Sequence, residues 1–397
     1  MADDSRTPDW NPRAAEVLRD QVKAYDSMRA RCPVAWSDYQ QWTLFRHGDV
    51  MRVLEDHRTF SSKASSHLSV PNGMDPPEHT PYRRVIEPYF SSQAMNQFEP
   101  TCRTIARDLV SNLPGGRPFD VVEEFSRAFA LQIQCAFMGW PDALHQPLRE
   151  WVLKNHQATL ARDRQALADV AHEFDGYIHD LLETRRQAGA DAPRDVTTSL
   201  MEETVNGRTL TDEELTSLLR NWTVGELGTI SSSVSILVSY LAEHPDLRQS
   251  LANDSVALPD AIDEILRMDA PLMSNRRVTT REVEIGGITI PAGEKITILW
   301  ASANRDERVF GDPDAFCPHK NRDHNLLYGA GVHVCPGAPL ARMELRVLME
   351  EFLAAVDTLE PAPDQQPERA VFPTGGFSFL PMVIGLHLPI LKSRNVR

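Results

Sequence analysis

The sequence predicts a mainly α-helical protein with a small β region. Apolar residues recur at helical spacing through long segments of the 397-residue chain, a pattern typical of amphipathic helices. Alternation of apolar and polar residues, which predicts strands, is confined to short stretches. One of these surrounds Gly286-Gly287 and is typical of a β-hairpin.

The expected elements follow one another along most of the chain. Helical periodicity predicts helices over residues 11–31, 98–113, 121–138, 145–157, 162–186 and 212–219, and a long apolar helix opens over 221–233. Strands are expected over residues 34–45, 283–290 and 295–301.

The chain shows no internal division. No Gly/Ser-rich linker, repeat or low-complexity tract interrupts it, so we expect a single domain over residues 1–397, with residues 1–10 as a flexible, polar N-terminus. No apolar run is judged long enough to span a bilayer, which predicts a cytoplasmic protein with no membrane partner. The five cysteines show no disulfide pattern, which favours a reducing compartment.

The charge balance excludes one class of partner. The formal net charge is −15, and a strongly acidic protein is not expected to bind nucleic acid.

The most informative stretch is a glycine-rich loop, residues 328–337, which presents Cys335 just before a helical pattern. The N–H groups and dipole at a helix N-terminus stabilise a thiolate. A thiolate bound to haem iron donates electron density that favours O–O cleavage. The glycines allow close approach of the backbone to a flat macrocycle.

This loop resembles the cysteine-ligand loop of the cytochrome P450 family, Phe-Gly-x-Gly-x-His-x-Cys-x-Gly. It departs at Tyr328, where the family usually has Phe. The resemblance implies the family's triangular helical prism, haem b with Cys335 as the axial ligand, and O2 as co-substrate. It also places Tyr328, Gly329 and Gly337 at the cofactor.

Zinc binding is the alternative for this region. Soft ligands gather in one short segment, but their spacing matches no common zinc finger; they are Cys317, His319, His324, His333 and Cys335.

A second motif is Glu264-x-x-Arg267, two residues on one helix face. The family's Glu–Arg pair locks to a downstream loop, which resembles residues 313–316 here. Ala315 stands where the family often has Arg, so Arg305 or Arg322 is left to complete the network.

Four residues are expected to bind the haem propionates by resemblance. His79 and Arg83 lie at i and i+4, so they point the same way. Arg277 and His333 match the family's partners of the other propionate. Arginine binds carboxylates in bidentate fashion.

The distal helix departs from the family's Ala-Gly-x-Asp/Glu-Thr pattern. Residues 225–229 are Gly-Glu-Leu-Gly-Thr, which places Thr229 on the family's threonine and Glu226 in a slot for a small residue. At i−3 from Thr229, Glu226 shares its helix face and could handle protons with it. Substrate anchoring, peroxide activation and a structural pair with an arginine remain alternatives for Glu226. Gly225 and Gly228 predict a local kink.

The resemblance places the substrate pocket among five segments, residues 61–73, 151–175, 222–233, 272–276 and 374–379. Trp222, Phe377 and Phe379 are the expected aromatic walls, and Met273, Asn275 and Arg276 the polar ones. This mixture favours a modest, functionalised molecule as substrate.

The function implied is a monooxygenase that inserts one oxygen atom into a small organic substrate, by hydroxylation or O/N-demethylation. Electrons would come from a separate ferredoxin and NAD(P)H-dependent reductase, docking on basic residues of the proximal face: Arg84, Arg103, Arg342 and Arg346. A peroxide-driven peroxygenase and a non-catalytic haem sensor are the alternatives.

Overall fold

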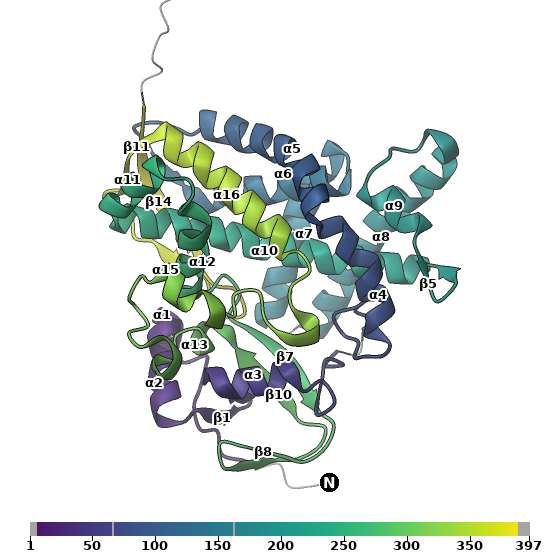
Figure 1. Cartoon of the computed structure of the whole chain (residues 1–397), viewed down its shortest axis with the longest axis vertical. Coiled ribbons are helices and arrows are strands. Elements are labelled where there is room, and N and C mark those ends of the chain that lie inside the picture. The colour runs from purple at the N-terminus through teal and green to yellow at the C-terminus, as the bar shows by residue number, and fades with distance from the viewer. Residues whose placement is uncertain (1–5, 66, 162, 388–397) are drawn as a thin grey trace, which may run out of the picture.

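The computed structural model describes residues 6–65, 67–161 and 163–387. A helical region contains α5, α6, α7, α10 and α16, and a smaller region holds most of the sheet together with α1, α2 and α3 (Figure 1). The arrangement is the mainly helical fold with a small β region that the sequence predicts.

The main helices are long and enclose the core. Their bounds are α4 His79–Ile86, α5 Ser92–Ser111, α6 Arg127–Met138, α7 His145–Ala161, α8 Arg164–Ala188, α10 Asp212–Glu243, α12 Leu258–Met268 and α16 Ala338–Ala355. Shorter helices include α1 Ala15–Arg19, α2 Gln21–Arg31, α3 His47–Glu55, α9 Val196–Glu202, α11 Pro245–Asn253, α13 Trp300–Ala303, α14 Glu307–Phe310 and α15 Pro318–Asn321.

The largest sheet has five strands in the order β1-β2-β10-β7-β3. Their bounds are β1 Val34–Ser37, β2 Gln41–Leu44, β3 Phe60–Ser61, β7 Ser274–Thr279 and β10 Lys295–Leu299. A three-stranded sheet joins β11 Val356–Pro361, β14 Pro381–Leu386 and β4 Pro118–Asp120, and the predicted hairpin is β8 Val283–Ile285 with β9 Ile288–Ile290. Gly286 and Gly287 form its turn with φ of 59° and 79°, angles that favour glycine.

Helix α10 is the central core helix. A capping box starts it, in which the Thr211 side chain accepts from the Glu214 backbone N–H and the Glu214 side chain accepts from Thr211. It is long and apolar enough to cross a membrane, contrary to our expectation that no segment would be, but most of the apolar window is buried inside the fold.

Two other expectations require correction. The predicted first helix is broken at Asp20, whose side chain caps α2. Helix α10 continues as an α-helix through Gly225 and Gly228, so no widened turn interrupts it there. Residues 1–5 of the expected flexible N-terminus lie outside the described residues, and Trp10 is buried against Tyr25 and Phe45.

The Glu264–Arg267 pair is fully buried and fixes α12 to the loop that leads towards Cys335. Arg267 Nε and Nη2 donate to the two Glu264 oxygens at 2.8 and 3.0 Å. Arg267 also donates to the carbonyls of Asn304 and Pro313, and Glu264 accepts from the Cys317 backbone at 2.9 Å. Burial opposes ionisation of Glu264, but these hydrogen bonds outweigh it and lower the pKa of the carboxyl.

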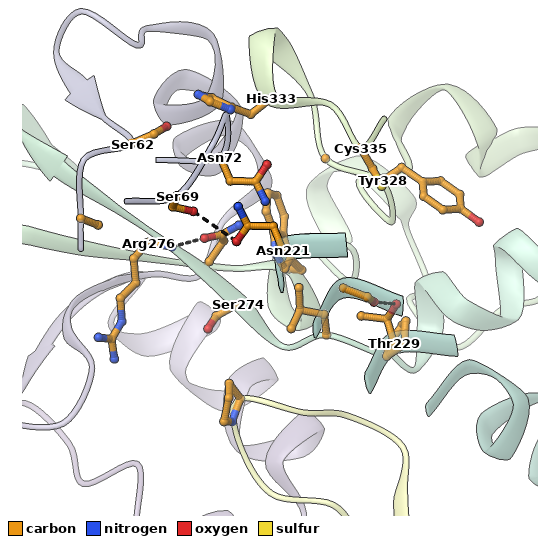
Figure 2. Close-up of a pocket in the computed structure, with 18 of the residues that line it drawn as sticks. Ser62, Ser69, Asn72, Asn221, Thr229, Ser274, Arg276, Tyr328, His333 and Cys335 are labelled. Atoms are coloured by element: carbon orange, nitrogen blue, oxygen red, sulfur yellow. Dashed lines mark hydrogen bonds between the residues drawn. The ribbon is translucent and has the colours of Figure 1, made fainter. Parts of the chain in front are cut away.

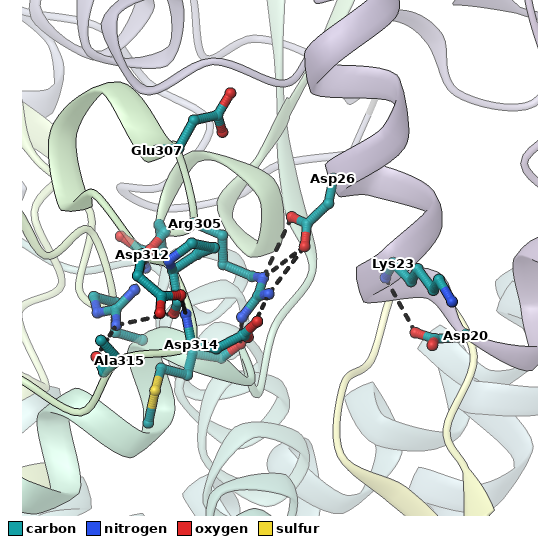
Figure 3. Close-up of polar contacts among 12 residues, drawn as sticks. Asp20, Lys23, Asp26, Arg305, Glu307, Asp312, Asp314 and Ala315 are labelled. Atoms are coloured by element: carbon teal, nitrogen blue, oxygen red, sulfur yellow. Dashed lines mark hydrogen bonds and ion pairs between the residues drawn. The ribbon is translucent and has the colours of Figure 1, made fainter.

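Arg305, and not Arg322, completes this network. Its guanidinium bridges Asp26 and Asp314 at 2.9 and 2.7 Å, and the same group donates to the carbonyl of Met268 (Figure 3). At Ala315 only the backbone carbonyl takes part, accepting from Arg267 at 3.5 Å. Arg322 pairs instead with Asp260 on the surface.

Candidate haem site

The cysteine loop is held by its own backbone. The Cys335 N–H donates to the Tyr328 carbonyl at 2.8 Å, and the N–H groups of Gly337 and Ala338 hydrogen-bond to the thiol. Burial raises the pKa of Cys335, while these two N–H groups oppose the rise. Since α16 begins at Ala338, the sulfur lies at a helix N-terminus, as the sequence predicts.

A glycine is required at one point of this loop. Gly331 has φ of 69°, and a Cβ there would lie 2.3 Å from the Leu54 carbonyl oxygen, well inside contact distance. Gly329 also adopts positive φ, at 70°. At Gly337 a side chain would fit, since a Cβ there would lie at ordinary contact distances of 3.8 Å from Phe90 and 3.9 Å from Cys335.

The ring of Tyr328, in the same loop as Cys335, stacks against the guanidinium of Arg342. The Arg342 guanidinium carbon is 4.4 Å from the Tyr328 ring centroid, a cation–π arrangement. The Tyr328 hydroxyl points to Asp263 Oδ1 at 3.5 Å, and Asp263 accepts from Arg342 at 2.9 Å. The hydroxyl that distinguishes this position from the family's Phe therefore has a polar partner.

The four residues expected at the propionates converge on one side of the cavity. The His79 and His333 ring centroids are 4.5 Å apart. Arg83 donates to the Val334 carbonyl at 2.7 Å, next to the cysteine. Arg277 is 6% exposed, and among the described residues no carboxylate lies within ion-pair distance of its guanidinium.

In the part of the chain that the structure describes, His79, His333 and Arg277 lack the partners that carboxylates would provide, whereas Arg83 already pairs with Glu87 at 2.9 Å. The Nε2 atoms of His79 and His333 are buried and accept or donate no hydrogen bond within the described chain. Burial first, and then the nearby cations, lower the pKa of His333 to about 4 and also lower the pKa of His79. Buried polar atoms are normally satisfied, so the two orphaned histidine nitrogens fit haem propionates. The buried Arg277 guanidinium donates to the Arg276 carbonyl at 2.7 Å but has no carboxylate partner among the described residues, which fits the same role.

The distal wall carries Thr229 and Glu226. The Thr229 hydroxyl donates to the Gly225 carbonyl at 2.6 Å, so its interaction is with the helix backbone. Glu226 lines the cavity, and its side chain meets Glu344 on α16. Within the described residues no arginine forms an ion pair with Glu226, which argues against the alternative of a structural pair with an arginine.

Glu344 is a site residue that the sequence analysis missed. It is fully buried and lies on the same face of α16 as the buried residues Leu340, Val347 and Leu348. A carboxylate on the apolar face of an amphipathic helix was the available signal, because buried charges are rare.

A cavity of about 1570 Å³ extends over Cys335 and Thr229. Hydroxyl and amide side chains gather along its wall in Figure 2, where Ser69 donates to Asn221 at 3.3 Å. Four of the five predicted pocket segments line it, but residues 374–379 do not. Phe377 is buried under Arg369, and Phe372 and Pro373 line the cavity in its place.

The zinc alternative finds no support. Across the ranges that the structure describes, no group of three or more His, Cys, Asp or Glu side chains could hold a metal ion.

The basic residues expected at the proximal face are mostly neutralised. Arg103 and Arg346 share Glu99 and Glu350, and Arg342 pairs with Asp263. Arg84 on α4 is exposed. The face is thus an ion-pair network and not a strongly positive patch.

Comparison with known proteins decides the family. The family described as Cytochrome P450 matches residues 57–384. The chain belongs to the cytochrome P450 family. It is therefore a P450 monooxygenase, with haem b held by a cysteine thiolate and O2 as co-substrate.

Known relatives and solved structures match this P450 along most of its length. The erythromycin C-12 hydroxylase of Saccharopolyspora erythraea is 31% identical over 100% of the chain and 97% of that protein. The vitamin D(3) 25-hydroxylase of Pseudonocardia autotrophica is 30% identical over 83% of the chain and 85% of that protein. The structure of a mutant of P450 EryK with erythromycin B superposes with a TM-score of 0.85 at 30% identity, covering 94% of this chain and 98% of that one.

Replacing Arg277 with leucine should weaken haem retention. Removing a charge-assisted hydrogen bond costs roughly 1.5–3 kcal/mol, so haem transfer to an excess of apomyoglobin should become roughly 10- to 100-fold faster. Arg281→Leu is the control, because Arg281 is exposed and donates to Thr59. Equal transfer rates for the two variants would contradict the propionate assignment.

Proposed function

We propose that this P450 binds its haem through Cys335 and oxidises a polar, oxygen-bearing small molecule in the cavity above it. His79, Arg83, Arg277 and His333 would hold the propionates, with Tyr328, Gly329 and Gly337 against the cofactor. The bound haem supplies activation of O2 and transfer of one oxygen atom to substrate, by hydroxylation or O/N-demethylation. The proposed substrate class rests on one observation, the polar wall of the cavity.

The polar wall comes from three separate parts of the chain. Ser62, Ser69 and Asn72 precede α4, Asn221 belongs to α10, and Ser274 with Asn275 begins β7. Apolar walls are the norm in ligand pockets, and a few polar groups fix orientation. A wall with this many hydroxyl and amide groups supports a substrate that carries several oxygen atoms.

Thr229 and Glu226 are proposed to handle protons at the distal wall. Burial raises the pKa of Glu226 to about 7, while its hydrogen bond with Glu344 opposes the rise. A carboxyl near neutrality can both accept and donate a proton at working pH. The Thr229 hydroxyl, one helical turn away, would orient water beside it.

The proposed electron source is a separate ferredoxin with an NAD(P)H-dependent reductase, in the cytoplasm. Exposed Arg84 and half-exposed Arg342 are the candidate contacts on the proximal face. A peroxide-driven reaction is the second candidate, favoured by the carboxyl of Glu226 at the cavity. Turnover with hydrogen peroxide, without NAD(P)H, would favour that candidate. The hydroxylase names of the relatives compared above argue against a non-catalytic haem sensor.

A spin-state titration of the ferric protein tests the substrate class. Matched pairs of ring compounds, each with its deoxygenated hydrocarbon analogue, would be compared by the spectral shift on binding. We expect the oxygenated member to bind about 10-fold more tightly, equivalent to about 1.4 kcal/mol.

The variant Asn221→Leu sharpens this test. It keeps the number and branching of the side-chain heavy atoms and should reduce the preference, whereas Asn253→Leu at the end of α11 should not. Equal or tighter binding of the hydrocarbon members to the unaltered protein would overturn the proposed substrate class.

A further inference from the structure

Two buried carboxyl groups face each other where α10 and α16 meet. Glu226 reaches from the cavity wall, and Glu344 reaches from the buried face of α16. The side chains lie within hydrogen-bond reach of each other. The two helices are in direct contact, so this juxtaposition belongs to the helix packing.

The surroundings supply no compensating charge. Within the described chain, neither carboxyl forms an ion pair with Lys, Arg or His. The other titratable groups that influence the pair are the thiols of Cys102 on α5 and Cys335 in the haem loop. Burial and the two carboxyls raise the pKa of Cys102, so its thiol is neutral.

The hydrogen-bond pattern indicates a missing proton donor. If both groups were ionised, Oε1 of Glu226 and both oxygens of Glu344 would be buried without a donor among the described residues. Two like charges in contact in a poorly solvated site strongly disfavour double ionisation. A proton on one carboxyl provides the donor and leaves one negative charge in the pair.

The two positions are not equivalent. Glu226 borders the cavity, whereas Glu344 is completely enclosed. Ionisation costs more where solvent is excluded. Burial, the charge of Glu226 and the hydrogen bond between them together raise the pKa of Glu344 well above its usual value.

We infer that Glu344 is a positioning residue that holds a proton shared with Glu226, and so sets the charge of the carboxyl that faces the cavity. The inference rests on the proposed role of Glu226 and deepens it. Glu344 donates its O–H to Glu226, and the pair carries one proton and one negative charge. Glu226, as the ionised member of the pair, accepts a proton from cavity water on one side and donates one back to it, while the proton on Glu344 stays in the pair.

Infrared spectroscopy of the ferric holoprotein tests this inference without turnover. An ordinary glutamate has a pKa of about 4.3 and is almost fully ionised at neutral pH. We expect a C=O stretching band of a protonated carboxyl at neutral pH, shifted in D2O. Glu344→Gln should weaken the band, because Glu226 is then the one member of the pair that can carry a proton. Glu226→Gln should keep it at a shifted frequency, because the partner becomes an amide.

Glu243→Gln is the matched control, since Glu243 is an exposed carboxylate at the end of α10. It should leave the band unchanged. Absence of the band in the unaltered protein, or its persistence unchanged in Glu344→Gln, would overturn the inference. Should Glu344→Gln not fold, an unshifted band in Glu226→Gln would overturn it equally.

This readout separates the inference from the proposed function. A band that behaves as expected supports the shared proton, even if Glu226→Gln turns over substrate normally and so refutes the catalytic role of Glu226. Conversely, a missing band refutes the shared proton and leaves the assignment of Cys335 untouched.

Discussion

Replacing Glu264 with alanine should lower the free energy of unfolding by about 3–5 kcal/mol, because it leaves the Arg267 guanidinium charged and unpaired inside the protein. Arg267 is 0% exposed, so water cannot replace the lost carboxylate. The same change also removes the acceptor for the Cys317 N–H and for the Asn321 amide. The loop towards Cys335 would lose its anchor on α12.

Chemical unfolding of the haem-bound protein, followed by circular dichroism, measures this change. Asp260→Ala is the control on the same helix, since Asp260 forms a surface ion pair with Arg322. Surface pairs contribute about 0–1 kcal/mol. If the two variants were destabilised equally, the buried network would not be the anchor that the geometry indicates.

Replacing Cys335 with serine should reduce product formation to the background given by free haem. Among the described cysteines, Cys335 alone lines the cavity. A hydroxyl does not supply the electron density with which a thiolate favours O–O cleavage. The loop itself should survive the change, because the Cys335 backbone makes its hydrogen bond to Tyr328 whatever the side chain.

Local sequence patterns predicted those parts of the site that are formed by residues close together in the sequence. The spacing of His79 and Arg83 places both on one face of α4, and the loop before α16 presents Cys335 at a helix start. Both arrangements follow from a few consecutive residues. The role proposed for these residues at a common cofactor comes from the family resemblance.

Contacts between distant segments were beyond the same reasoning. Glu344 meets Glu226 only because α10 and α16 cross, and Arg305 meets Asp26 only because the fold returns the chain to α2. The prediction that residues 374–379 line the pocket was wrong for the same reason. Phe372, and not Phe377, lines the cavity. A periodic pattern gives the buried face of an element, but not the element that packs against it.

The spectrum of the ferrous carbon monoxide complex tests the central claim most directly. It would be recorded for the unaltered protein, Cys335→Ser and Cys317→Ser, with haem content measured for each. We predict the thiolate-type spectrum in the unaltered protein and in Cys317→Ser, and its loss in Cys335→Ser. A thiolate-type spectrum that persists in haem-loaded Cys335→Ser would contradict the assignment of Cys335 as the axial ligand.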